Sequence, residues 1–136
     1  MNNLQNYSMD NMVKGWTRVD MLIALYDRTI SAIELAQQAK GQGDNAQMAA
    51  HLIQVNRFIL ALHSGLDIDN SELAGNIARL LNFVAYRLEQ QKFGEAIRFL
   101  TKLQATFEEI REEATKLEKD GKIPPLMSTA GLNTVA

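Results

Sequence analysis

Apolar residues recur at alternating intervals of three and four along much of this chain, and that spacing restricts the fold more than any other feature. The pattern is most regular in the last third of the sequence, where its members are Phe93, Ala96, Leu100, Leu103, Phe107, Ile110, Ala114 and Leu117. An α-helix of about 3.6 residues per turn gathers such residues on one face, whereas a strand requires strict alternation. Similar patterns fill residues 17–41, 46–62 and 72–88. The sequence therefore predicts an all-α protein.

Local signals at the ends of these stretches predict four helices joined by short connections. Thr17 can cap the first helix, and residues 69–72, Asp-Asn-Ser-Glu, supply an N-cap and a capping-box acid for the third. Between Arg87 and Phe93 we predict a tight turn, with one continuous helix that reaches into a swapped dimer as the alternative. The expected fold is an antiparallel up-down four-helix bundle.

The inward faces of the helices define the expected core. Its members in the first three helices are Val19, Leu22, Tyr26, Ile30, Ile33, Ala36, Met48, Leu52, Val55, Ile59, Leu62, Leu73, Ile77, Leu80, Leu81, Val84 and Leu88. The apolar pattern of residues 93–117 completes it. A chain of 136 residues is long enough to bury this core as one domain.

Two helices carry apolar residues beyond the core face. In residues 46–62, Ile53 and Leu60 belong to a second stripe roughly 120° from the first at about 100° per residue. In residues 72–88, Phe83 points about 110° away from the core face, with Asn76 and Arg87 to either side of it on the same strip. A bundle helix needs about one apolar face, so the surplus predicts either burial on several sides or a groove that receives another helix.

The two ends of the chain differ from the helical region, residues 17–120. Residues 1–16 are polar and rich in asparagine but carry scattered apolar side chains, so they form either a frayed terminus or a flap over an apolar groove. If they form a flap, removing residues 1–12 should raise the affinity for a partner. Glycine and two prolines precede a small, polar segment, so residues 121–136 should be a flexible tail.

Composition and motifs exclude several classes of function. The net charge is −2 with both signs interleaved, so no basic field favours nucleic acid or an anionic membrane. The sequence has no cysteine, Glu-x-x-His motif or glycine-rich phosphate loop, and His51 and His63 are too far apart to share a metal ion. We therefore expect no enzyme activity, cofactor or metal. No signal peptide or apolar run of ~20 residues is present, which predicts a cytoplasmic protein without membrane insertion.

Residues 72–88, ELAGNIARLLNFVAYRL, resemble the third helix of the FliS family of flagellin export chaperones, whose pattern is E-I-A-x-N-L-x-x-L-Y-x-Y-M-x-x-R-L. The identical residues are Glu72, Ala74, Asn76, Leu80, Arg87 and Leu88, and the conservative ones are Leu73, Ile77, Phe83 and Val84. Leu81 replaces a tyrosine of the family. The family's motifs in neighbouring helices are matched at Leu25, Tyr26, Asp27, Leu66 and Asp67. The family's proline before the first helix and its late tryptophan are absent here.

The resemblance implies a stoichiometric chaperone that binds the C-terminal segment of flagellin, prevents premature polymerisation and delivers flagellin to the export apparatus. Tyr7 lies near the position of the family's N-terminal tyrosine. The expected partner contacts are Tyr7, Tyr26, Ile53, Leu60, Leu66, Asn76, Leu80, Phe83 and Arg87. The alternative is a helical adaptor or regulatory protein of the flagellar system that uses the same apolar face for homodimerisation or for another partner.

Overall fold

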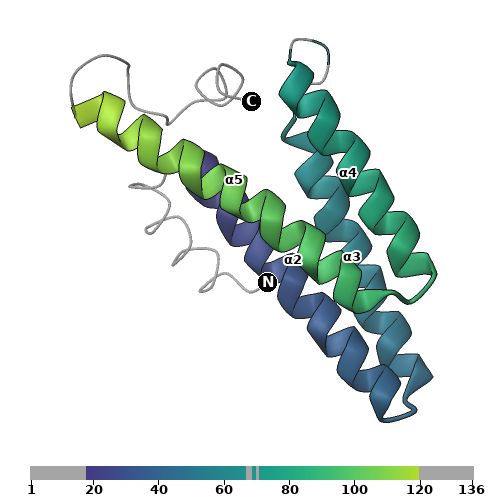
Figure 1. The fold of residues 1–136 in the computed structure, drawn as a ribbon. Helices are drawn as coiled ribbons and strands as arrows, with labels where there is room; N and C mark the ends of the chain where they lie inside the picture. Colours follow the sequence, from purple (N-terminus) through teal and green to yellow (C-terminus); the bar gives the residue numbers. More distant parts are fainter. Residues whose placement is uncertain (1–17, 67–68, 70, 120–136) are drawn as a thin grey trace, which may run out of the picture.

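The structure, a computed structural model, describes residues 18–66, 69 and 71–119. Its elements are α2 (Arg18–Gly41), α3 (Asn45–Ser64), α4 (Glu72–Glu89) and α5 (Phe93–Lys119). Successive helices run in opposite directions, and the described residues contain no strand (Figure 1). The predicted all-α, four-helix bundle is therefore confirmed. The expected flap at residues 1–16 with Tyr7, the capping Thr17 and the tail at residues 121–136 lie outside the described residues.

Helices α2 and α5 pack against each other along most of α2. Near the end of α2, the ammonium of Lys40 lies 5.6 Å from the centre of the Phe93 ring at the start of α5. Near the start of α2, Arg111 Nη1 lies 3.3 Å from Asp20 Oδ1. The contact on α2 moves toward its N-terminus as the contact on α5 moves toward its C-terminus, so the two helices are antiparallel. The other close neighbours are α3 on α2 and α4 on α5, while α3 and α4 touch less (Figure 1).

The middle of the α2–α5 contact combines aromatic packing with polar links. The rings of Tyr26 and Phe107 lie 5.7 Å apart between centroids, and both side chains are buried. Beside them, Gln104 Nε2 donates to the Ile23 carbonyl oxygen at 3.2 Å and to Asp27 Oδ1 at 2.6 Å. Burial also raises the pKa of the Tyr26 hydroxyl above its ordinary value, because the charged phenolate would lose its hydration. Tyr26 and Phe107 are the two largest fully buried side chains among the described residues.

Most of the expected core is confirmed. The buried core cluster consists of Val19, Leu22, Ile23, Tyr26, Ala32, Ile33, Ala36, Val55, Ile59, Leu62, Ile77, Leu81, Val84, Leu88, Phe93, Ala96, Leu100, Leu103 and Phe107. The expectation is wrong for Leu73 and Leu80 on α4, which are each 38% exposed. Ala74 and Ala78 are buried instead. Small side chains let a neighbouring helix approach closely, so the buried stripe of α4 is rotated toward its alanines.

The helix ends after α2 and α4 share one capping geometry. Gly43 and Gln91 have φ values of 73° and 58°, in the left-handed region. After α4, the Lys92 N–H donates to the Arg87 carbonyl oxygen at 2.9 Å, and the corresponding bond after α2 also measures 2.9 Å. These are Schellman motifs, which reverse the chain within a few residues. The predicted turn before Phe93 is thus confirmed, and the alternative of one continuous helix is wrong.

Replacing Gln91 by glycine should stabilise the protein. A side chain at positive φ is strained, whereas glycine adopts this conformation without steric cost. We expect Gln91→Gly to raise the free energy of unfolding by about 0.5–1 kcal/mol, measured by chemical denaturation. The reciprocal control, Gly43→Ala, should lower it by a similar amount. A Gln91→Gly protein less stable than the parent would contradict this assignment of strain.

Burial of Tyr26 should make stability sensitive to alkaline pH. Below pH about 10 the hydroxyl is protonated in both states, and above it only the unfolded chain releases the proton readily. Stability should therefore fall as the pH rises above about 10, and Tyr26→Phe should remove this part of the fall. Thermal unfolding between neutral and alkaline pH would measure it, with Tyr86→Phe, at an exposed tyrosine, as the control. Parallel alkaline curves for Tyr26→Phe and the parent would contradict the prediction.

Candidate partner-binding surface

One side of helix α4 exposes large apolar side chains next to polar residues. At about 100° per residue, Leu73, Asn76, Leu80, Phe83 and Arg87 fall on one side of the buried stripe, and we call this set the α4 flank. Phe83 is 41% exposed. The spacing is that of residues one or two helical turns apart, so the α4 flank is a continuous strip along the helix.

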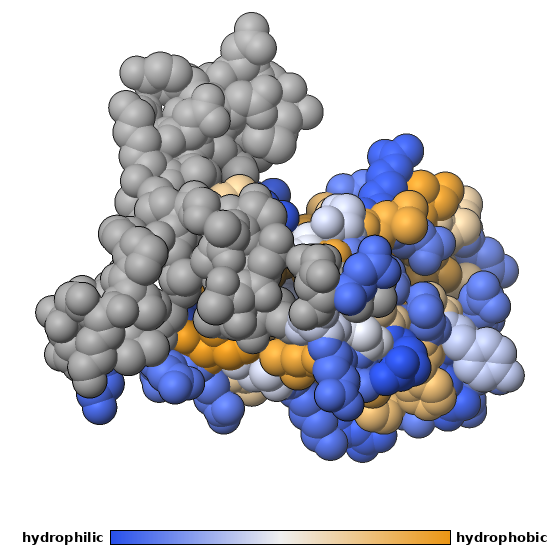
Figure 2. Space-filling model, turned by 90° about the horizontal axis from the view of Figure 1, so that it is seen from above, coloured by the Kyte–Doolittle hydropathy of each residue, from blue (hydrophilic) through white to orange (hydrophobic). Residues whose placement is uncertain are grey.

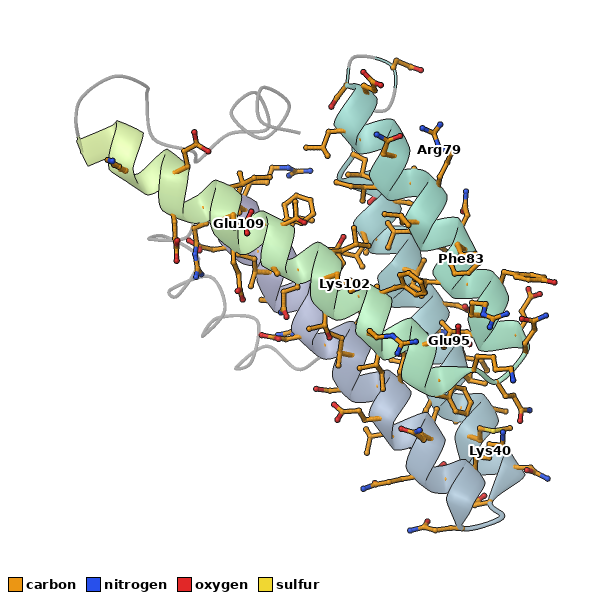
Figure 3. All side chains as sticks on the ribbon, viewed as in Figure 1. Lys40, Arg79, Phe83, Glu95, Lys102 and Glu109 are labelled. Carbon is orange, nitrogen blue, oxygen red and sulfur yellow. The ribbon has the colours of Figure 1, made fainter. Side chains whose placement is uncertain are left out.

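The aromatic ring of Phe83 is held by contacts on both sides. It meets the ring of Phe99 on α5 edge to face, with centroids 5.3 Å apart and planes at 87°. The guanidinium carbon of Arg87 lies 5.8 Å from the Phe83 centroid, and Lys102 Nζ lies 6.0 Å from that of Phe99. Figure 3 shows Phe83 on α4 and Lys102 on the neighbouring α5. Sequence reasoning missed Phe99 and Lys102, although Phe99 stands off the core pattern of its own helix as Phe83 does.

Arg87 links the end of α4 to the start of α5. Its Nη1 donates to Gln90 Oε1 at 2.8 Å, and its Nη2 forms an ion pair with Glu95 Oε2. Both members of this ion pair are partly exposed. The Nε of Arg87 is buried and has no hydrogen-bond acceptor among the described residues. The guanidinium therefore has bonding capacity that the described part of the chain leaves unused.

The remaining expected contacts lie in several different places. Ile53 and Leu60 are exposed on α3 at 56% and 69%, and no described contact joins them to the α4 flank. Leu66 is partly buried and packs against the core. Tyr26 is 1% exposed, so a partner cannot touch its side chain in this arrangement of the helices. Asn76 is exposed, and its Oδ1 accepts a hydrogen bond from Arg79.

A pocket between α2 and α3, among the described residues, offers little room for a small molecule. A shallow, open pocket of about 190 Å³ lies between the start of α2 and the end of α3, lined by Arg18, Met21, Leu22, Leu25, Ala61, Ser64 and Gly65. This volume is below the few hundred Å³ usual for ligand sites. Within the described ranges, no three histidine or acidic side chains gather as metal ligands. Among the helices described, none is both long and apolar enough to cross a membrane.

Hydrophobic side chains instead reach the surface in patches among charged ones, as Figure 2 shows from above. The fold and the α4 flank together define an all-α bundle with an apolar, partly basic strip suited to another protein chain. The family model described as flagellar protein FliS matches residues 1–115. The chain therefore belongs to the FliS family and is a flagellar protein of the FliS chaperone type. No relative among curated proteins matches the chain.

The exposure of Leu80 predicts that its substitution costs less stability than that of a buried leucine. Leu81, next to it, is 0% exposed, so Leu81→Ala should lower the free energy of unfolding by about 2–5 kcal/mol. Leu80→Ala removes a side chain that is already partly in water and should cost about 1 kcal/mol. Chemical denaturation of both variants measures the difference. Equal losses would contradict the placement of Leu80 outside the core.

Proposed function

We propose that this FliS-family protein binds the C-terminal segment of flagellin in the bacterial cytosol, prevents premature polymerisation and delivers flagellin to the export apparatus. It acts as a stoichiometric chaperone and needs neither a catalytic step nor a cofactor. The observation that carries the proposal is that the family-matching residues Asn76, Leu80 and Phe83 are exposed on one strip, with Arg87 partly exposed beside them. A core helix has no structural need to expose a leucine and a phenylalanine side by side.

The α4 flank suits a helix that docks by its apolar side. Asn76, Leu80, Phe83 and Arg87 follow one another at intervals of four, three and four, so they form one straight ridge. An amphipathic segment that is disordered alone can fold onto such a ridge and bury its own apolar face. The Phe83 ring is already held against Phe99, which reduces the entropy lost on binding.

Helix α3 supports the proposal with a second contact region. Ile53 and Leu60 are seven residues apart, so they share one side of α3. Both are more exposed than Phe83. A long flagellin segment that wraps around the bundle would cover this pair as well as the α4 flank. A partner that contacts both helices would bind more tightly than through either contact alone. Once the first contact has formed, the second is intramolecular and has a high effective concentration.

Phe83→Ala should weaken binding of a flagellin C-terminal peptide by about 2 kcal/mol, because it truncates an aromatic anchor at the centre of the flank. Isothermal titration calorimetry with the parent and the variant measures this loss. Leu35→Ala is the control, since Leu35 is an exposed apolar residue on α2. It should leave the affinity unchanged.

Thermal unfolding of the same proteins separates binding from folding. A Phe83→Ala protein that unfolds far below the parent while its folded fraction binds normally would remove Phe83 from the contact surface. A parent protein that is a tight dimer and ignores the flagellin peptide would favour the adaptor alternative instead.

A further inference from the structure

Resting on the proposed function, we propose that the α4 flank selects a partner helix that carries a carboxylate beside its apolar side chains. In the free protein the Glu95 carboxylate forms the ion pair with Arg87. On binding, the partner's carboxylate replaces Glu95 in this ion pair, and Glu95 turns to solvent. Glu95 would thus be a built-in competitor that sets which segments the surface accepts.

The charges around the aromatic pair point to an acidic partner. Arg87 lies against the ring of Phe83 at 5.8 Å, and Lys102 lies against the ring of Phe99 at 6.0 Å. The faces of aromatic rings carry partial negative charge and hold these cations in place. Within the contacts described for this cluster, the acidic group is Glu95. Cations beside an exposed apolar strip favour a helix with acidic residues next to its apolar ones.

The unused capacity of Arg87 shows where a partner's carboxylate would bind. A guanidinium has five N–H donors, and its Nε and Nη2 form a planar fork that matches a carboxylate. Here Glu95 uses Nη2 while the buried Nε lacks an acceptor among the described residues. A buried donor without a partner costs free energy. In the proposed complex the departure of Glu95 uncovers this side of Arg87, and a carboxylate from the partner then accepts from both nitrogens.

Replacing Glu95 by the partner's carboxylate is favourable because the ion pair of Arg87 with Glu95 is more exposed to water than the ion pair in the complex would be. The Arg87–Glu95 pair is partly exposed, so water and salt weaken it. A helix lying on Leu80 and Phe83 would exclude water from Arg87, and the new pair would be stronger in that setting. Glu95 also loses little on release, because it lies in the first turn of α5, where the helix dipole favours a negative charge.

The spacing on α4 defines the complementary motif. Phe83 follows Leu80 by three residues, and Arg87 follows Phe83 by four. A docked helix would therefore present apolar residues three or four apart and an Asp or Glu one turn beyond them.

The test compares two peptides on the full-length protein and its variants. One is the flagellin C-terminal peptide, and the other is the same peptide with every Asp and Glu replaced by Asn and Gln. We expect the parent to bind the acidic peptide about two- to tenfold more tightly, with the difference shrinking as salt is added. Glu95→Gln should raise the affinity for the acidic peptide about two- to fivefold and leave the neutral one unchanged.

Two further variants serve as controls. Glu89→Gln removes the same charge from an exposed position at the end of α4 and should change neither affinity. Arg87→Gln should abolish the preference for the acidic peptide, with thermal unfolding used to correct for any loss of folded protein.

The outcomes distinguish this inference from the proposed function. Equal binding of the two peptides by the parent overturns the acid preference, although flagellin binding itself stands. Three results for the Glu95→Gln variant overturn the role of Glu95 as a competitor. These are unchanged affinity for both peptides, higher affinity for both, and lower affinity for both. A parent protein that binds neither peptide overturns the proposed function.

Discussion

The packing of α5 against α2 is the contact on which the rest of the structure depends. It buries Tyr26 against Phe107 and continues along α5 as far as Arg111. In its first two turns α5 also meets α4, where Glu95 pairs with Arg87 and Phe99 packs against Phe83. Helix α4 packs on α5 less extensively than α2 does, and only lightly on α3. The exposure of the α4 flank follows from this unequal division of α5.

The contact of α4 with the start of α5 orders the exposed residues of α4. An isolated phenylalanine on a surface helix would sample several rotamers, and ordering it on binding would cost entropy. Phe83 instead lies edge to face on Phe99 and beneath Arg87. A partner that docks here as proposed would meet aromatic and cationic groups that are already in contact with one another. The α4 flank thus combines the exposure that binding needs with the order that makes binding favourable.

The turn between α4 and α5 contributes to this order at some cost to stability. Gln91 adopts a positive φ that glycine would adopt more easily. The strained residue stands between Gln90 and Glu95, both of which bond to Arg87. The tight reversal brings the last turn of α4 opposite the first turn of α5. Without that reversal Arg87 would not reach an acid eight residues further along the chain.

Reading the sequence alone predicts the four helices, the core faces of three of them and, through residues 72–88, the family. Such features depend on periodicity and local motifs, which neighbouring residues carry. The exposure of Leu80 and the burial of Ala78 could not be predicted from the sequence. Apolar residues occur on several sides of α4, and the positions of the neighbouring helices determine which of them are buried. The tertiary structure also decided that Phe99 meets Phe83 and that Tyr26 is enclosed by α5. Contacts between distant segments depend on the angles and positions at which the helices cross. Local sequence patterns do not predict this geometry.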